Sequence, residues 1–335
     1  MQEIKITKKE EGYKLKKICM NYLNQAPASF IYKMLRKKNI VLNDKKADGN
    51  ETVKAGDVIK LYMRDETIDG FRTSEVSRLG TNNTKTKLDI IYEDDDYIFC
   101  NKPVNLLSQK AKKDDVSINE MIISYLLEKG SITEESLKLF RPSICNRLDR
   151  NTSGIILAAK TPKGARFLSK IIKDRSLRKY YLAVVPRKPA KLGHFTAYLS
   201  KDESSNKVTI YNKKTDGAAL IETDVSLIEY NPKTETSLLS IELITGKSHQ
   251  IRAHLASLRM PIIGDIKYGS EIINEMYKKN YGVKSQLLSA YKVEFPESAD
   301  SILSGKVFYA KPPHSFDSFI IRKDIISGNL ENQRS

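Results

Sequence analysis

The spacing of apolar residues predicts a small folded unit at residues 12–63. Apolar residues recur at helical spacing in its first part, which predicts one helix at 13–23 and a second helix that Ser29 can cap. Short apolar runs at 40–43 and 58–62, separated by turn-forming Asp and Gly residues, predict strands. The pattern therefore indicates a compact α/β unit with a core of its own.

Residues 64–87 break this pattern. They are rich in Thr, Asn, Ser and Lys, and the run at 80–84 holds almost no apolar residue. Such a composition is typical of a linker. We expect these residues to let the small unit move relative to the rest of the chain.

Residues 88–325 predict a larger domain in which strands dominate. Apolar and polar residues alternate at 221–227 and 239–243, which predicts half-buried strands, and helices are predicted at 118–127 and 162–173. Because strands come in runs with few helices between them, the expected fold class is α+β. We expect a mixed, largely antiparallel sheet with flanking helices.

Composition adds a prediction about the partner. The 335 residues include 57 Lys and Arg against 41 Asp and Glu, which gives a net charge of +16. This excess favours a polyanionic partner, with nucleic acid first and an anionic membrane surface second. The longest apolar runs are far shorter than the ~20 residues that span a bilayer, and the first residues lack the apolar core of a signal peptide. We therefore expect a cytoplasmic protein that does not enter the membrane.

The cysteines and histidines argue against a bound metal. The three cysteines and four histidines are scattered along the sequence, without the spacing of a metal site. The sequence also contains no phosphate loop and no dinucleotide fingerprint. We expect reduced cysteines, no metal and no cofactor, and nothing in the pattern indicates an obligate dimer, so we expect a monomer.

The second predicted helix carries a face of cations. Lys33, Arg36 and Lys37 fall opposite its apolar residues, and no acidic residue accompanies them there. A charged helix face is often only solvated. Three unpaired cations beside a short turn-strand unit favour contact with phosphates.

A carboxylate near two arginines stands at the start of a polar turn. Asp149 lies between Arg147 and Arg150, and the turn after them ends at Gly154, within the start of an apolar run. Nearby cations favour an ionised carboxylate, which can act as a nucleophile or as a base. The same residues also fit a structural Asp that caps the turn and pairs with Arg147. These residues alone leave both readings open.

Two further polar clusters lie beside predicted strands. In one, Ser248 can cap a helix on which Arg252 lies off the apolar stripe, where it can face a cleft or simply the solvent. In the other, Tyr180 and Tyr181 face opposite sides of a strand. One ring can then stack on a nucleobase while the other joins the core, although both rings can also belong to the core.

Two resemblances bring these features together. Residues 12–63 resemble the alpha-L RNA-binding module first seen in a small-subunit ribosomal protein, with Asn39, which tolerates a left-handed cap, where that module usually has Gly. The region 88–319 resembles the RluA family of pseudouridine synthases, most closely the RluC- and RluD-like members that act on large-subunit ribosomal RNA. The segments that carry this second resemblance are 93–103, 147–154, Lys179 with Tyr181, 245–255 and 264–269.

The family resemblance implies an activity and a set of site residues. It implies the pseudouridine synthase fold and the isomerisation of specific uridines in RNA, with ribosomal RNA favoured and no cofactor. The essential aspartate falls on Asp149, the aromatic that stacks on the target base on Tyr181, and the arginine that pairs with the aspartate on Arg252. Arg150 falls on the residue that helps displace the target nucleotide.

The chain also departs from the family pattern. Asn146 stands where His is usual, Ser248 where Thr is usual, and Asn105 where Gly is favoured. A transfer-RNA pseudouridine synthase, a non-catalytic RNA-binding ribosome-assembly factor and a base-excising glycosylase are the alternative readings. The joint presence of Asp149, Tyr181 and Arg252 favours catalysis over a degenerate domain.

Overall fold

The computed structural model describes residues 1–72, 87–112, 114–297 and 301–322. The chain divides into two compact units that interleave along the sequence. The first comprises Met1–Phe99, Ser108–Asn146 and Leu157–Ser169, and the second comprises Cys100–Leu107, Arg147–Ile156 and Lys170–Ser335. The sequence instead predicts consecutive regions at 12–63, 64–87 and 88–325, and these boundaries stay a prediction.

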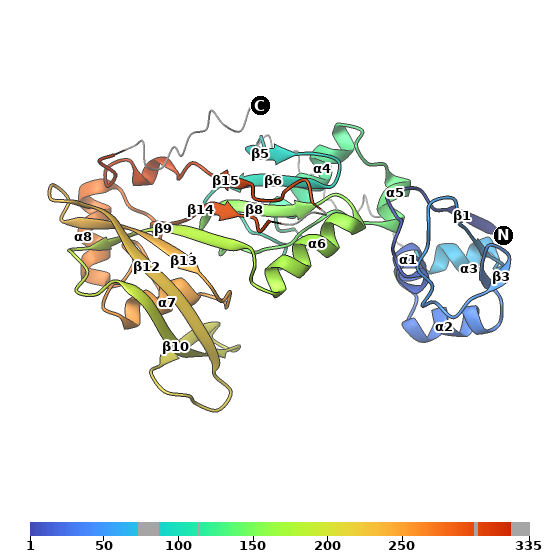
Figure 1. Cartoon of the computed structure of the whole chain (residues 1–335), viewed down its shortest axis with the longest axis horizontal. Helices are drawn as coiled ribbons and strands as arrows, with labels where there is room; N and C mark the ends of the chain where they lie inside the picture. The colour runs from blue at the N-terminus through green and yellow to red at the C-terminus, as the bar shows by residue number, and fades with distance from the viewer. Residues whose placement is uncertain (73–86, 113, 298–300, 323–335) are drawn as a thin grey trace. The chain divides into compact units, whose positions relative to one another are not determined.

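The N-terminal part of the first unit is built on a four-stranded sheet with the strand order β1-β4-β2-β3 (Figure 1). Its elements are β1 (Gln2–Lys5), α1 (Leu15–Tyr22), α2 (Ala28–Arg36), β2 (Ile40–Leu42), β3 (Lys45–Lys46), β4 (Val58–Leu61) and α3 (Asp65–Gly70). Leu15 and Ile18 of α1 pack with Ile31 and Leu35 of α2 in one apolar core. The predicted helices and strands of this region are therefore present.

Both ends of this region differ from the expectation. β1 pairs antiparallel with β4 ahead of residue 12, and Ile68 of α3 joins the core from residues that we expected to be linker. The rest of the expected linker, residues 73–86, lies outside the described residues. A four-residue strand with one buried position and a six-residue helix give patterns too short to recognise in the sequence.

The second helix also begins and ends differently. Ser29 does not cap α2, because the helix starts at Ala28 directly after Pro27, whose backbone is extended. Proline is well suited to this place, since it has no amide hydrogen to leave unbonded. At the other end the left-handed residue is Lys38, with φ 61°, and not Asn39.

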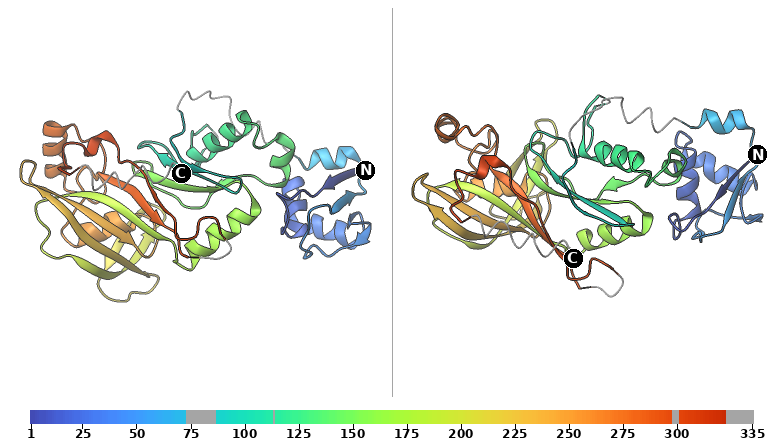
Figure 2. Two further views of the ribbon diagram at one scale, coloured as in Figure 1. Left: turned by 45° about the horizontal axis from the view of Figure 1, so that its top comes forward. Right: turned by 90° about the horizontal axis from the view of Figure 1, so that it is seen from above.

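The rest of the chain forms the predicted α+β fold, which is therefore confirmed (Figures 1 and 2). The large sheet has the strand order β11-β10-β12-β13-β9-β14-β8-β6-β5, with β15 beside β14 and β7 beside β8. The pairs from β11 to β14 are antiparallel, whereas β14 and β8 are parallel. The strands are β5 (Ile90–Glu93), β6 (Tyr97–Lys102), β7 (Ser143–Ile144), β8 (Ser153–Ala159), β9 (Arg178–Pro186), β10 (Gly193–Asp202), β11 (Lys207–Tyr211), β12 (Ala219–Asn231), β13 (Thr236–Leu243), β14 (Leu288–Glu294) and β15 (Val307–Tyr309).

Helices cover both faces of the sheet in the second unit. Ala253 packs with Ile221 on one face, and Tyr277 packs with Tyr180 on the other. Val225 lies four residues after Ile221 on the same face of β12 and pairs with Ile241 of β13, which in turn pairs with Tyr181. The side chain of Tyr181 therefore lies on the Ile221 face, and that of Tyr180 on the other. The helices of the large domain are α4 (Ile118–Glu128), α5 (Glu134–Leu139), α6 (Pro162–Lys173), α7 (Gln250–Ser257), α8 (Glu271–Tyr281) and the short η2 (His314–Phe316). Within the described ranges, every helix is too short or too polar to cross a membrane.

Candidate active site

A buried lysine, Lys102, hydrogen bonds to the backbone of the turn that carries Asp149. Lys102 is completely buried, and its Nζ donates to the carbonyls of Pro103, Leu106 and Arg150 at 2.9, 2.8 and 3.1 Å. Burial lowers the pKa of Lys102 to about 7, while the nearby Asp149 carboxylate opposes this effect. Three carbonyl acceptors need three N–H donors, which only the ammonium form has. We therefore take Lys102 as charged, with the backbone after Asp149 fixed by it.

Gly154 ties the same turn to a neighbouring strand. It follows Ser153 at the start of β8, and its φ of 114° is one that side chains rarely adopt. A Cβ at this position would lie 2.1 Å from the carbonyl oxygen of Ala290 on β14. Ser153 and Ser289 hydrogen bond at 2.9 Å beside it. Only glycine permits this close approach, so the turn is packed directly on the backbone of β14.

The helix that carries Arg252 starts in an unexpected way. Ser248 does not cap it, because α7 begins at Gln250 and the preceding residue, His249, is left-handed. The buried Gln250 side chain stabilises this start instead. Its Oε1 accepts from Thr245 Oγ1 at 2.9 Å, and its Nε2 donates to the Glu222 carbonyl at 3.0 Å. The helix start is thus anchored to β12.

Arg252 joins two carboxylates. Its Nη1 donates to Asp149 Oδ2 at 2.7 Å, while Nε and Nη2 donate to the two oxygens of Asp265 at 2.7 and 2.9 Å. Burial opposes the charge of Arg252, but the hydrogen bonds and charges of Asp265 and Asp149 outweigh burial and raise its pKa. Burial likewise opposes ionisation of Asp265, and Arg252 reverses this effect, so the pKa of Asp265 is lowered. Arg252 and Asp265 are therefore both charged at neutral pH.

Tyr181 lines the pocket that contains Asp149. The pocket is lined by residues from four separate stretches of chain, among them Arg147, Asp149, Tyr181, His249, Arg252 and Leu288. Burial raises the pKa of Tyr181, and the charge of Asp149 raises it further, so the phenol stays protonated. Tyr180 lies in the core on the other face and donates to Glu294 at 3.0 Å. Of the two tyrosines, Tyr181 lines the pocket and Tyr180 packs in the core.

The two arginines near Asp149 have different places. The structural interpretation of the turn predicts an ion pair between Asp149 and Arg147. In the structure, the short ion pair of Asp149 is with Arg252. Arg147 is exposed and lines the pocket. Arg150 is also exposed, and among the described residues it is not part of the pocket lining. The prediction that Arg150 meets the RNA stays open.

Several residues near the pocket were given no role from the sequence. His249 Nδ1 lies 2.8 Å from the Tyr268 hydroxyl, and its Nε2 lies 4.0 Å from Asp149 Oδ1. Asp265 and Tyr268 belong to a segment whose sequence was noted for its resemblance alone. The signal in the sequence that could have identified these residues is the clustering of ionisable side chains in the segments 245–255 and 264–269.

The family departures are explained locally for two residues. Asn105 has a φ of 63°, and Asn is the residue after Gly that best tolerates this conformation. The Asn146 side chain accepts a hydrogen bond from the Leu157 amide at 2.8 Å. Nothing in the structure explains why Ser248 replaces Thr.

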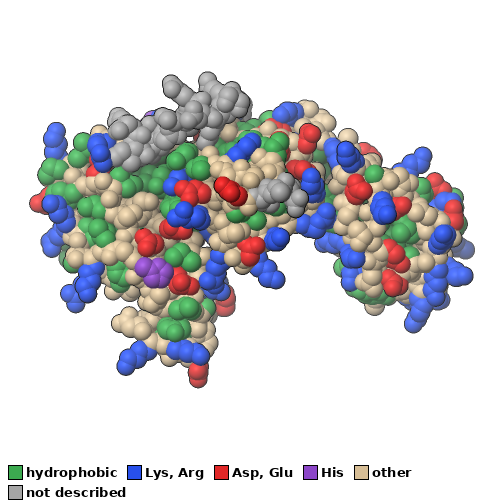
Figure 3. Space-filling view, in the orientation of Figure 1, with side chains coloured by type: hydrophobic (Ala, Val, Ile, Leu, Met, Phe, Trp, Pro, Cys, Tyr) green, Lys and Arg blue, Asp and Glu red, His purple; other side chains and the backbone are tan. Residues whose placement is uncertain are grey.

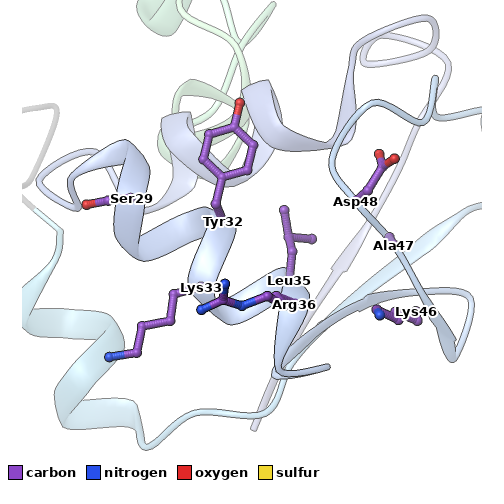
Figure 4. Close-up of a pocket in the computed structure, with 8 residues that line it drawn as sticks. All are labelled: Ser29, Tyr32, Lys33, Leu35, Arg36, Lys46, Ala47 and Asp48. Atoms are coloured by element: carbon purple, nitrogen blue, oxygen red, sulfur yellow. The ribbon is translucent and has the colours of Figure 1, made fainter.

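The cations of α2 line a second, open pocket (Figure 4). Lys33 and Arg36 project from the helix, and Lys46 lies on the neighbouring strand β3. Tyr32 also lines this pocket and accepts a hydrogen bond from Lys16 at 3.1 Å. The exposed Lys37 follows the last helical residue, outside this lining. Of the three residues predicted to contact phosphate, Lys33 and Arg36 therefore line the same pocket.

Comparisons with known proteins agree with this architecture. The family model described as RNA pseudouridylate synthase matches residues 96–257. An uncharacterised RNA pseudouridine synthase of Mycoplasma genitalium is 32% identical over 87% of this chain and 88% of its own length. Ribosomal large subunit pseudouridine synthase D of Borreliella burgdorferi is 32% identical over 69% of this chain and 67% of its own length. Synthase C of Buchnera aphidicola is 26% identical over 90% and 91%.

Solved structures share the fold. Human RNA pseudouridylate synthase domain containing 4 superposes with a TM-score of 0.54 at 20% identity, covering 68% of this chain and 92% of the human chain. Human RNA pseudouridylate synthase domain containing 1 gives a TM-score of 0.53 at 18% identity, covering 75% and 98%. The similarity lies in the architecture, since the sequences have diverged far.

Proposed function

The chain belongs to the RNA pseudouridylate synthase family, and from this premise we propose that it isomerises specific uridines of large-subunit ribosomal RNA, with Asp149 as the reacting carboxylate. Isomerisation of uridine in RNA is the activity of the family. Ribosomal RNA is supported by the names of the relatives from Borreliella burgdorferi and Buchnera aphidicola. The role of Asp149 is supported by the pocket that joins it to Arg252 and Tyr181.

The reaction rearranges one bond and one proton within the uridine. The bond between ribose C1′ and uracil N1 breaks, the base turns, and C1′ bonds to uracil C5. The proton on C5 leaves, and N1 gains one. Atoms, charge and oxidation state balance between uridine and pseudouridine, so the net reaction consumes no other molecule.

The ion pair with Arg252 is the observation that carries the role of Asp149. The carboxylate can attack C1′ as the C1′–N1 bond breaks, and this new bond to C1′ then breaks when C5 bonds to C1′. Alternatively, the carboxylate can remove the proton from C2′ as the C1′–N1 bond breaks, and this proton returns to C2′ when C5 bonds to C1′. Both routes use the carboxylate as an anion, and the Arg252 guanidinium supplies the opposite charge through its hydrogen bond of 2.7 Å. Because Arg252 binds Oδ2, the oxygen Oδ1 is left for the substrate.

The target base has to leave its stack to reach this pocket, which costs roughly a few kcal/mol. The ring of Tyr181 offers the base a stacking surface beside Asp149. The exposure of Arg150 on the same turn supports its proposed contact with RNA phosphate or with the space that the base leaves. Binding the extracted nucleotide in this way offsets the loss of stacking.

Further RNA contacts come from the basic surface. Lys and Arg side chains spread over much of the face in Figure 3, with acidic side chains among them. On the N-terminal part, Lys33, Arg36 and Lys37 are exposed and supply phosphate contacts, as an alpha-L module would. This second surface can hold the RNA outside the reacting nucleotide.

The test is to combine Asp149→Asn with a map of pseudouridines across the transcriptome in cells with and without the protein. We expect the variant to bind RNA and to leave uridine unchanged, and the missing pseudouridines to lie in large-subunit ribosomal RNA. Pseudouridine formation near the wild-type rate by Asp149→Asn would overturn the role of Asp149. Missing sites in transfer RNA alone would change the substrate, and abasic RNA would indicate a glycosylase.

A further inference from the structure

We infer that His249 is a further active-site residue, whose Nε2–H group donates a hydrogen bond to the 2-carbonyl oxygen of the target uracil. This inference rests on the proposed function, because it places the reacting nucleotide beside Asp149. The reacting bond joins the ribose to the uracil. Asp149 acts on the ribose, and the hydrogen bond from His249 is made to the uracil that departs.

The first observation is the backbone of His249. The residue is left-handed, with φ 53° and ψ 14°, although it is not glycine and its side chain is only 12% exposed. A non-glycine residue in this region stores strain and persists where its surroundings fix it. The conformation points the imidazole into the pocket that Asp149 and Tyr181 also line.

The second observation fixes which ring nitrogen carries the proton. His249 Nδ1 lies 2.8 Å from the Tyr268 hydroxyl, and that oxygen already accepts a hydrogen bond from the Val208 amide at 3.1 Å. The phenol proton is therefore directed to Nδ1, which acts as the acceptor. A neutral imidazole that accepts through Nδ1 carries its hydrogen on Nε2.

The third observation concerns charge. Burial lowers the pKa of His249, while the charges that face it divide: Asp149 and Asp265 favour protonation, and Arg252 and Lys267 oppose it. The imidazole is therefore neutral at neutral pH. It presents a single N–H donor to the pocket and holds no net charge that would compete with Arg252 for Asp149.

The position of this N–H group selects its acceptor. Nε2 lies 4.0 Å from Asp149 Oδ1, which is too long for a hydrogen bond between them. In the complex that we infer, a uridine whose C1′ meets Oδ1 has its base beside Nε2. The carbonyl oxygen O2 is bonded to the ring carbon next to N1, so it lies close to the breaking bond.

The chemistry explains why a donor is useful there. When the C1′–N1 bond breaks, its electron pair stays with the base, and the negative charge spreads to O2. A fixed N–H donor stabilises that charge without giving up its proton. The donor therefore acts more strongly in the transition state than in the bound substrate.

The test begins with the tautomer. The full chain, labelled with ¹⁵N-histidine, contains only four histidines, so each ring can be assigned by substitution. We expect the Nε2–H tautomer for His249 in the wild type, and loss of this preference in Tyr268→Phe. An Nδ1–H tautomer in the wild type would overturn the inference.

The second part measures single-turnover rates for His249→Gln and His249→Leu on RNA. Both substitutions meet the same left-handed backbone, but only Gln keeps an N–H donor. We expect His249→Leu to be about 10- to 100-fold slower than His249→Gln, with RNA affinity unchanged. His314→Leu, at an 89% exposed position, is the control and should match the wild type. Equal rates for the Gln and Leu variants would contradict the inference.

The third part changes the acceptor. Replacing the target by 2-thiouridine weakens the hydrogen bond at that position only. The wild type should be slowed by this replacement more than His249→Leu, whereas 4-thiouridine should slow both to the same extent. Equal sensitivity to 2-thiouridine would overturn the contact. If Asp149→Asn proves active, the proposed function fails; if it is inactive while His249→Leu keeps the wild-type rate, only this inference fails.

Discussion

Asp265 holds Arg252 through two parallel hydrogen bonds, at 2.7 Å to Nε and 2.9 Å to Nη2. Both side chains are buried, and the fork leaves Nη1 to reach Asp149. Asp265 also accepts from the amides of Lys267 and Tyr268 at 2.8 and 3.1 Å. It therefore acts on the reacting carboxylate through the guanidinium, as a positioning residue.

Asp265→Asn is expected to lower both stability and rate. An amide cannot balance the buried guanidinium, and breaking such a pair costs about 3–5 kcal/mol of unfolding free energy. Urea unfolding and single-turnover rates of the folded variant check this. Glu275→Gln breaks an exposed pair with Lys278 and should change stability by less than ~1 kcal/mol. Wild-type stability and rate in Asp265→Asn would rule out the positioning role.

Substitutions of Tyr181 separate the ring from its hydroxyl. Tyr181→Phe keeps the stacking surface and should bind RNA that contains the target uridine nearly as well as the wild type. Tyr181→Leu removes the aromatic face, which should cost about 1–3 kcal/mol of binding to the flipped base. Titration of RNA carrying a non-reacting uridine analogue measures the difference. Similar affinities for the Phe and Leu variants would show that the base does not stack there.

Removing the cations of α2 should change how RNA affinity depends on salt. Each phosphate contact adds roughly 0.7–0.9 to the slope of log affinity against log salt. Alanine at Lys33, Arg36 and Lys37 together should lower the slope by about 2–3 units. The control removes the same charge from the exposed Lys278, Lys279 and Lys284, and should leave the slope nearly intact. An unchanged slope in the first variant would separate this surface from RNA.

The buried His254 predicts a dependence of stability on pH. Burial lowers its pKa from 6.5 to about 4, and its Nδ1 lies 3.0 Å from Thr223 Oγ1. Above pH ~6.5 the ring is neutral in both the folded and unfolded states. Between that pH and about 4 only the unfolded state takes up the proton, so stability falls as the pH falls through this range.

Urea unfolding of the wild type and of His254→Gln from about pH 4 to about pH 8, a range that contains the folded and unfolded pKa values, tests this. The Gln variant should show a flatter decline toward acid. His314→Gln replaces an exposed histidine and should follow the wild type. A parallel decline in the two Gln variants would exclude His254 as the source.

The sequence predicts the structure best where the pattern of a single segment determines the element that the segment forms. The alternation at 221–227 lies within β12, and Asp149, Tyr181 and Arg252 stood out from their neighbours in sequence. The structure brings these three to one pocket, although their roles stay a prediction. The expected α+β class follows from such local patterns and is confirmed.

What the sequence left out depends on contacts between distant segments. Asp265 and Lys102 act through hydrogen bonds to groups that lie elsewhere in the chain. No local periodicity marks such a partner. The helix cap assigned to Ser248 was wrong for a related reason, because the buried Gln250 reaches β12 and fixes the helix start from there.

The contact between Gly154 and Ala290 has a consequence for how substrate and enzyme adapt to each other. With backbone packed on backbone, the turn that carries Asp149 has no room to rearrange when RNA arrives. We therefore expect this part of the pocket to change little, so that the polynucleotide has to bend, unpair and unstack to reach Asp149. On this basis we expect weakly paired or strained uridines to be converted ahead of equally exposed uridines in stiff helices.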